Sequence, residues 1–187
     1  MKSLRAPMGA AAVILAAASI GSAAAEELTI GLAAEPSAMD PHYHNLGPNN
    51  AMRTHIFEAL IEQDAEQQLE PYLALSWRTL DDTTWEFKLR EGVKFHDGTD
   101  FDAKDVIYTV CRVPLVADSP SSFTIYTKAI AGMEAQGPHT LIIKTDGPYP
   151  LLPTELASVG IISAPDDVTD ITFSRDGCEG MGEQPTT

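Results

Sequence analysis

His96 and Asp97 are residues whose types could support acid–base catalysis, because a carboxylate can orient an imidazole as a general base. Asp97 is followed by Gly98, however, and this dipeptide is typical of tight turns. Adjacent residues on a strand also point to opposite faces, and no G-x-S-x-G motif precedes the pair. We therefore interpret His96 and Asp97 as a structural turn and expect no catalytic residue. A secreted hydrolase is the disfavoured alternative.

His42 and His44 could supply two imidazole ligands to a metal ion from one loop rich in Pro, Gly, Asn and His. Two histidines are too few for a metal shell, and no cysteine or carboxylate cluster stands at ligand spacing. The sequence therefore favours a polar loop, and we expect no bound metal and no cofactor.

Ser122 and Phe123 follow Pro120 in a second polar loop, where a hydroxyl and an aromatic ring could meet a ligand. The sequence leaves open on which side of the fold this loop lies. Trp77, Trp85 and Phe87 are interpreted as core residues rather than as pocket residues.

Composition excludes several classes of protein. The chain has 187 residues with 12 Lys+Arg and 27 Asp+Glu, a net charge of −15. Such acidity argues against nucleic acid as a partner, because phosphate binding needs a basic surface. The 44% of hydrophobic residues fits a soluble globular protein.

The N-terminus has the three parts of a secretory signal peptide: Lys2 and Arg5, then an apolar stretch, then small residues ending at Ala25. We expect cleavage after Ala25 and a soluble, monomeric periplasmic chain. The two cysteines would then meet an oxidising compartment. Cys111 lies on the apolar face of a predicted helix, so we expect a buried free thiol, with a Cys111–Cys178 bridge as the alternative.

Hydrophobic periodicity predicts interleaved strands and helices, hence an α/β or mixed α+β class. Trp85, Phe87 and Leu89 alternate with polar residues and indicate a half-buried strand. Asp102 is expected to cap a helix that ends near Pro114. The remaining predicted elements are strands at 28–32, 140–144 and 159–163 and helices at 51–64 and 151–158. From residue 172 the sequence lacks periodicity, which predicts a frayed terminus or a chain cut short.

Four segments carry a recognisable signature: EPYLA at 70–74, SW at 76–77, WEFKLREGVKFHDG at 85–98 and FDAKDV at 101–106. They resemble the family 5 extracellular solute-binding proteins of ABC importers, the peptide/nickel-binding group. EP at 35–36 and MDP at 39–41 are similar to that family's loop after the first strand, and HIFEAL at 55–60 to its first helix. The resemblance covers residues 28–166.

The resemblance implies a type II periplasmic binding fold, in which two lobes enclose the ligand. Because family members are several hundred residues long, it implies an incomplete N-terminal lobe. Residues 1–25 would be the signal peptide, 26–48 the first strand and loop, 49–166 a family-specific subdomain and 167–187 an irregular truncated tail.

The resemblance also implies a function, which is to capture oligopeptides or similar small solutes and deliver them to an inner-membrane ABC permease. It would bring Tyr43, His44 and Asn45 to the cleft, where an aromatic ring and an amide suit a peptide. One lobe cannot enclose a ligand, so we expect the chain alone to bind poorly. Nickel or haem binding, or a non-functional remnant, are the alternatives.

Overall fold

The computed structural model describes Thr29, Gly31 and residues 34–182. The expected signal peptide, its cleavage site and most of the strand expected at 28–32 lie outside these residues. The chain from Leu32 onward forms one compact unit, and the following description concerns that unit.

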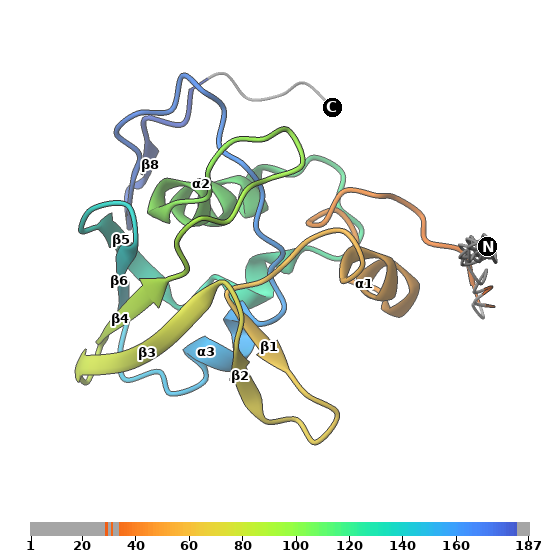
Figure 1. The fold of residues 1–187 in the computed structure, drawn as a ribbon, viewed down its shortest axis with the longest axis horizontal. Coiled ribbons are helices and arrows are strands. Elements are labelled where there is room, and N and C mark those ends of the chain that lie inside the picture. The colour runs from red at the N-terminus through yellow and green to blue at the C-terminus, as the bar shows by residue number, and fades with distance from the viewer. Residues whose placement is uncertain (1–28, 30, 32–33, 183–187) are drawn as a thin grey trace, which may run out of the picture. The chain divides into compact units, whose positions relative to one another are not determined.

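The larger sheet of this unit is antiparallel and has six strands, which lie at the left in Figure 1. Its strands, in spatial order, are β3 (Ala74–Asp81), β4 (Thr84–Leu89), β6 (Thr140–Thr145), β5 (Ile130–Ala135), β7 (Thr172–Ser174) and β8 (Gly177–Glu179). A separate two-stranded sheet pairs β1 (Ile61–Gln63) with β2 (Leu69–Pro71). The mixed α/β class predicted from the sequence is confirmed.

The predicted strand around Phe87 is β4, which lies inside the sheet between β3 and β6. Phe87 and Leu89 are buried, and Trp85 is half-buried and packs against the same core. Phe87 faces Leu141 across the β4–β6 pair, so the apolar sides of the two strands coincide. The alternation of apolar and polar residues therefore predicted both the strand and its buried face correctly.

The helix α2 (Ala103–Arg112) covers one face of the sheet and packs against β5 and β7 (Figure 1). Asp102 caps its N-terminus, as the sequence predicted, and Asp105 completes a capping box. The Asp102 carboxylate accepts a hydrogen bond from the Lys104 N–H at 2.7 Å, and Asp105 accepts one from the Asp102 N–H at 2.7 Å. Asp105 also accepts from the Ala164 N–H at 2.8 Å, which ties the helix start to a distant segment.

The prediction of a helix over residues 51–64 is wrong in its extent. The helix α1 (Gly47–Arg53) ends early, and the chain then runs into β1. The backbone carbonyls of Ala59 and Leu60 accept hydrogen bonds from the N–H groups of Leu73 and Ala74. Pairing with a distant segment therefore takes the place of helical bonds, although the apolar spacing is compatible with both.

The segment 159–163 is not a strand, although Val159 and Ile161 are buried. Its N–H groups bond to unlike partners: that of Ile161 to the Glu58 carbonyl at 2.7 Å, and that of Ile162 to the Thr109 hydroxyl at 3.1 Å. The segment is apolar because it is buried, and a short apolar run of this kind has the same composition as a buried strand. A short helix, α3 (Leu152–Leu156), lies within the range expected at 151–158.

The C-terminal part differs from the expected irregular tail, since β7 and β8 form a hairpin that extends the sheet beyond β5. Cys178 on β8 is bonded to Cys111 on α2, with the two Cα atoms 5.8 Å apart. The prediction of a free Cys111 thiol is therefore wrong. Cys111 is buried as expected, but the helix face that carries it meets the hairpin.

Reduction of the Cys111–Cys178 bridge is expected to lower the free energy of unfolding by about 2–4 kcal/mol, because the bridge joins residues 67 apart and restricts the unfolded chain. Chemical denaturation with and without reductant measures this loss. The control is the double variant Cys111→Ser/Cys178→Ser, whose midpoint should not respond to reductant. An unchanged midpoint for the wild-type chain on full reduction would contradict the expectation.

Candidate functional site

Two loops far apart in sequence lie side by side, and together they contain all five candidate ligand contacts. We call residues 40–46 and 119–123 the loop pair. The Asn45 N–H donates to the Ser121 carbonyl at 2.9 Å, and the Ser119 hydroxyl donates to the Tyr43 carbonyl at 2.5 Å. His44 and Ser121 also form a parallel β-bridge. The structure thus places the second loop beside the first, which the sequence could not do.

Tyr43, His44 and Asn45 are half-buried at the surface of the loop pair. The Asn45 amide donates to the Tyr126 hydroxyl at 3.1 Å and accepts from the Asn50 amide at 2.9 Å. The His44 ring is hydrogen-bonded to the Ser37 hydroxyl at 2.8 Å, and the Tyr43 ring meets it edge-on. These side chains are held in place and keep part of their surface open to solvent.

Phe123 and Ser122 have a different role from the one expected. Phe123 is only 1% exposed, and its ring packs edge-on against His42 with centroids 6.1 Å apart. The Ser122 hydroxyl accepts from the Thr124 N–H at 3.2 Å and caps the 3-10 helix η2 (Phe123–Tyr126). The aromatic ring therefore forms the packed base of the loop pair rather than its surface.

A polar cluster with a buried histidine and a partly buried ion pair fixes the first loop to the rest of the unit. Asp40 forms an ion pair with Arg112, at the end of α2, through both of its carboxylate oxygens. His42 is fully buried, with Nε2 2.8 Å from the Gly160 carbonyl and Nδ1 3.0 Å from Arg112 Nη1. Since a carbonyl only accepts and a guanidinium only donates, Nε2 carries the proton and the ring is neutral.

The electrostatics of this cluster agree with its geometry. Burial lowers the pKa of His42 to about 4, and the nearby Arg112 cation acts in the same direction. Burial alone would raise the pKa of Asp40, but the hydrogen bonds from Arg112 and from the His42 N–H hold it below its usual value. The cluster is therefore built for an ionised Asp40 and a neutral His42.

The two histidines of the first loop do not converge on a common point. Both ring nitrogens of His42 are already bonded inside the cluster, and His44 turns to Ser37. Within the described part of the chain, no group of three or more His, Cys, Asp or Glu side chains could hold a metal ion. A His42–His44 metal site would require the cluster to be dismantled.

Sequence reasoning missed Arg112, Gly160 and Tyr126, which complete the loop pair. Asp40 and Arg112 are 72 positions apart and His42 and Gly160 are 118 apart, so no spacing connects them. Gly160 passes close to the end of α1 and the segment after it, since a Cβ there would lie 3.4 Å from Arg53 Nη1 and 3.0 Å from the Phe57 Cβ atom. The only feature of the sequence that pointed to this site was the polar composition of the first loop.

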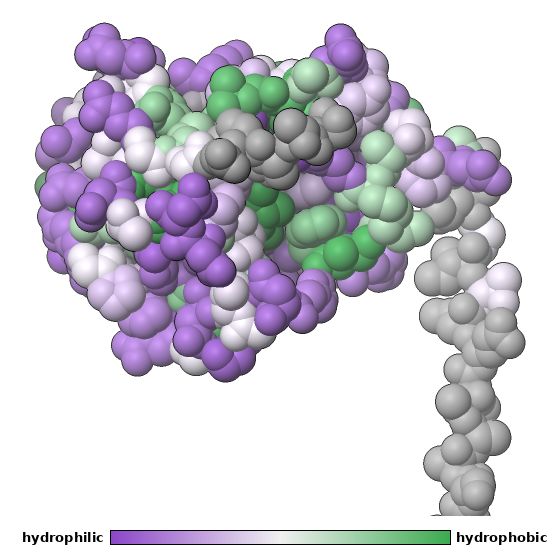
Figure 2. All heavy atoms as spheres, turned by 90° about the horizontal axis from the view of Figure 1, so that it is seen from above, coloured by the Kyte–Doolittle hydropathy of each residue, from purple (hydrophilic) through white to green (hydrophobic). Residues whose placement is uncertain are grey.

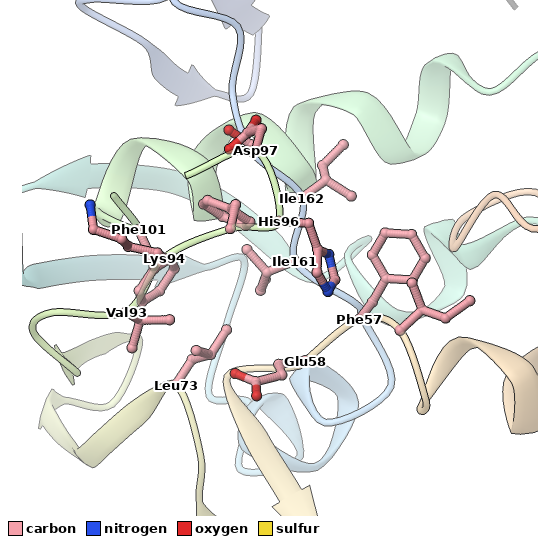
Figure 3. Close-up of a pocket in the computed structure, with 13 residues that line it drawn as sticks. Phe57, Glu58, Leu73, Val93, Lys94, His96, Asp97, Phe101, Ile161 and Ile162 are labelled. Atoms are coloured by element: carbon pink, nitrogen blue, oxygen red, sulfur yellow. The ribbon is translucent and has the colours of Figure 1, made fainter. Parts of the chain in front are cut away.

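His96 and Asp97 lie beside a cavity of about 380 Å³ (Figure 3). Figure 3 shows His96 near Phe57 at the cavity and Asp97 directed away from it. The Asp97 carboxylate accepts from the Thr99 N–H and hydroxyl at 2.9 and 2.6 Å, so the predicted turn is confirmed. The lining residues are Ile56, Phe57, Glu58, Leu73, Val93, Lys94, Phe95, His96, Asp97, Phe101, Ile161, Ile162 and Ser163.

The cavity lining offers little for nucleophilic catalysis. The hydroxyl of Ser163 is bonded to the Thr99 hydroxyl at 3.1 Å and to the Ala164 carbonyl at 3.2 Å rather than to His96. A nucleophile needs a base within hydrogen-bond reach. Most of the other lining side chains are apolar.

The surface of the unit is mainly polar on the face shown in Figure 2, with apolar residues in small patches. Among the described residues, no helix is both long and apolar enough to cross a membrane.

Replacement of His42 by glutamine is expected to remove a pH dependence of stability. As the pH falls below 6.5, His42 is protonated in the unfolded chain, whereas in the folded chain it stays neutral until about pH 4. The free energy of unfolding therefore falls with pH over this range. Between pH 7.5 and pH 5 the wild-type chain should lose about 2 kcal/mol more than His42→Gln.

Urea denaturation of both proteins across this range measures the difference. Asp105, whose pKa burial raises to about 6, contributes with the opposite sign, but it does so equally in both chains. Parallel stability curves for the two proteins would contradict the assignment of a neutral, buried His42.

Comparison with known proteins identifies relatives of this chain. Residues 68–182 match the family described as bacterial extracellular solute-binding proteins, family 5 Middle. The glutathione-binding protein GsiB of Escherichia coli O1:K1 is 34% identical over 127 residues, which are 67% of this chain and 25% of GsiB. The chain therefore spans about a quarter of the length of this relative.

Solved structures show the same relationship. The oligopeptide-binding protein AppA of Bacillus subtilis, in complex with a nonapeptide, superposes with a TM-score of 0.60 at 25% identity, over 69% of this chain and 26% of AppA. NikZ of Campylobacter jejuni, in complex with Ni(L-His), superposes with a TM-score of 0.58 at 26% identity, over 70% of this chain and 26% of NikZ. The family match covers more than half of the chain, and the chain belongs to the family 5 bacterial extracellular solute-binding proteins.

Proposed function

We propose that this chain forms one wall of the ligand site of an ABC importer's substrate-binding protein, which captures oligopeptides or a similar small solute in the periplasm and delivers them to an inner-membrane permease. The relatives support this proposal, because they are named for binding glutathione, oligopeptides and Ni(L-His) rather than for catalysis. Glutathione and histidine are both amino-acid-derived solutes. The binding protein makes and breaks no bond in this role.

The observation that carries the proposal is the rigid support under the loop pair. Asp40 and His42 fasten the first loop to Arg112 and Gly160, so the half-buried Tyr43, His44 and Asn45 are presented from a fixed base. Binding groups that are already ordered lose little conformational freedom on meeting a ligand. Tyr43 would stack on the solute, and Asn45 would hydrogen-bond to its polar groups.

Residues 26–48 are assigned to the first strand and loop of the N-terminal lobe, after a signal peptide that ends at Ala25. The family-specific subdomain is assigned to residues 49–182 rather than 49–166, because β7 and β8 continue its sheet. The mature protein would be a soluble periplasmic monomer.

The mechanism requires a second wall. A ligand site of this type buries about 70–90% of a small ligand, and the loop pair covers one side. Ligand bound between two lobes would favour the closed arrangement, and the permease would recognise that arrangement. This chain spans a quarter of GsiB, so the opposite wall would come from sequence beyond it.

Titration of the ¹⁵N-labelled full chain with trialanine tests the proposal. Saturable chemical-shift changes are expected at residues 43–45 and 121–123, with a millimolar dissociation constant because one wall leaves most of the peptide in water. Variant Asn45→Ala should weaken binding several-fold, whereas the matched control Gln68→Ala, which removes an exposed amide in the β1–β2 turn, should leave binding unchanged. Binding confined to other residues, or no shift in the loop pair up to 50 mM peptide, would disprove the site.

A further inference from the structure

The end of α2 is the point at which the disulfide bridge and the loop pair meet. Cys111, which is bonded to Cys178 on β8, is followed directly by Arg112, the last residue of the helix. Arg112 donates hydrogen bonds to the Asp40 carboxylate and to His42 Nδ1. The bridge to the hairpin and the ion pair that holds the first loop therefore leave α2 from adjacent residues.

The second loop is attached to the same end of α2. The chain continues from the helix into the 3-10 helix η1 (Val113–Leu115), which packs against η2. Val113 is buried and shares a small apolar cluster with Phe123 and Tyr126 of η2. The stretch 111–115 therefore supports both members of the loop pair.

The β7–β8 hairpin covers this end of α2 but has little attachment of its own. Within the described part of the chain, β8 pairs with β7 alone, and β7 joins the sheet through two residue pairs with β5. The strand β7 also contacts α2, and Cys111 is 1% exposed with the bridge in place. Short pairing at the edge of a sheet opens at low cost. Without the bridge, the hairpin would therefore open first and uncover the last turn of α2.

The last turn of a helix is its least stable part, because its final carbonyl groups have no partner within the helix. In α2 this turn carries Arg112. If the turn frays, the ion pair between Arg112 and Asp40 is broken for part of the time. His42 then also loses the Arg112 donor that orients its ring. Loss of the hairpin would in this way reach the first loop.

We propose that the Cys111–Cys178 bridge is a redox-sensitive clamp on the loop pair. In the oxidised chain the hairpin holds the end of α2 and both loops are fixed, whereas in the reduced chain the hairpin opens and the loops become mobile. Only the effect of this clamp on solute binding rests on the proposed function, because the order of the loops can be measured without a ligand.

Opening of the clamp is a two-electron reduction by a dithiol. Cys178 is half-buried and Cys111 is buried, so a thiolate of the reductant attacks the Cys178 sulfur. A mixed disulfide with Cys178 forms, and Cys111 leaves as a thiolate that takes up a proton. The second thiol of the reductant then displaces Cys178 as a thiol, and the reductant becomes a disulfide. Two electrons and two protons pass to the bridge, and a disulfide-carrying oxidant closes it by the reverse steps.

Amide hydrogen exchange of the full ¹⁵N-labelled chain tests the clamp, with the Asn45 N–H that bonds to the Ser121 carbonyl as the probe. Reduction with dithiothreitol should speed exchange of this amide at least tenfold, while the amides of β4 and β6 remain protected. The double variant Cys111→Ser/Cys178→Ser should exchange like the reduced chain and ignore the reductant. The matched control Leu89→Ala keeps the bridge and removes a buried side chain on β4, so it should lower stability without speeding exchange at Asn45.

A further variant tests whether Arg112 carries the effect. In Arg112→Gln the Asn45 amide should exchange rapidly with the bridge intact, and reduction should speed this exchange less than twofold. A tenfold response to the reductant in this variant would mean that the bridge acts without Arg112, and would overturn the coupling. If Arg112→Gln does not fold, Asp40→Asn removes the other charge of the pair and should give the same result.

The outcomes separate this inference from the proposed function. Equal exchange at Asn45 in the oxidised and reduced chains would overturn the clamp. Loss of protection throughout β4 and β6 on reduction would also overturn it, because the whole unit would then unfold. The oxidised chain should bind trialanine at least threefold more tightly than the reduced chain, and equal affinities would overturn the regulation of binding. If trialanine shifts no signal of the loop pair in either form, the proposed function fails, whereas the exchange rates decide the clamp on their own.

Discussion

The Asp40–Arg112 ion pair, with His42 packed beside it, is the interaction on which the candidate site depends. It joins the first loop to the end of α2, while α2 in turn lies on the central sheet. Because both side chains are partly buried, removing one member would leave the other charge partly out of water without its partner, which costs more than lacking both. The position of the first loop therefore depends on the packing of α2 on the sheet rather than on the loop's own sequence.

The neutral state of His42 is a second constraint on the same cluster. A protonated ring could no longer accept the Arg112 hydrogen bond and would place two cations in contact. Burial and neighbouring charge thus enforce one tautomer, and one tautomer fixes the ring's orientation against Phe123 and Gly160. A single imidazole in this way holds three separate segments of the chain together.

The elements that the sequence predicted well are those whose determinants are local. The N-cap at Asp102 and the alternation around Phe87 each have determinants within a few residues, and both are present in the structure. The helix expected at 51–64 and the strand expected at 159–163 failed because buried apolar residues look alike whichever backbone partners they have. Tertiary pairing, not periodicity, decided those two segments.

The candidate site was predicted in part, for the same reason. Its polar first loop could be read from composition, but the partners of that loop come from residues 112, 126 and 160, which no spacing rule connects to it. The sequence did not indicate that Arg53 is buried, although it is only 8% exposed. An arginine in the last turn of a helix is usually solvated and interacts with the negative end of the helix dipole. The burial of Arg53 is visible only in three dimensions.

The Cys111–Cys178 bridge has a consequence for the order in which the chain matures. Disulfides persist in oxidising compartments, so in a reducing one the β7–β8 hairpin would be held to α2 by packing and strand pairing alone. Under the proposed export to the periplasm, this weaker attachment would leave the hairpin easier to unfold while the chain crosses the membrane. Oxidation after passage would then lock the last two strands and make the step difficult to reverse.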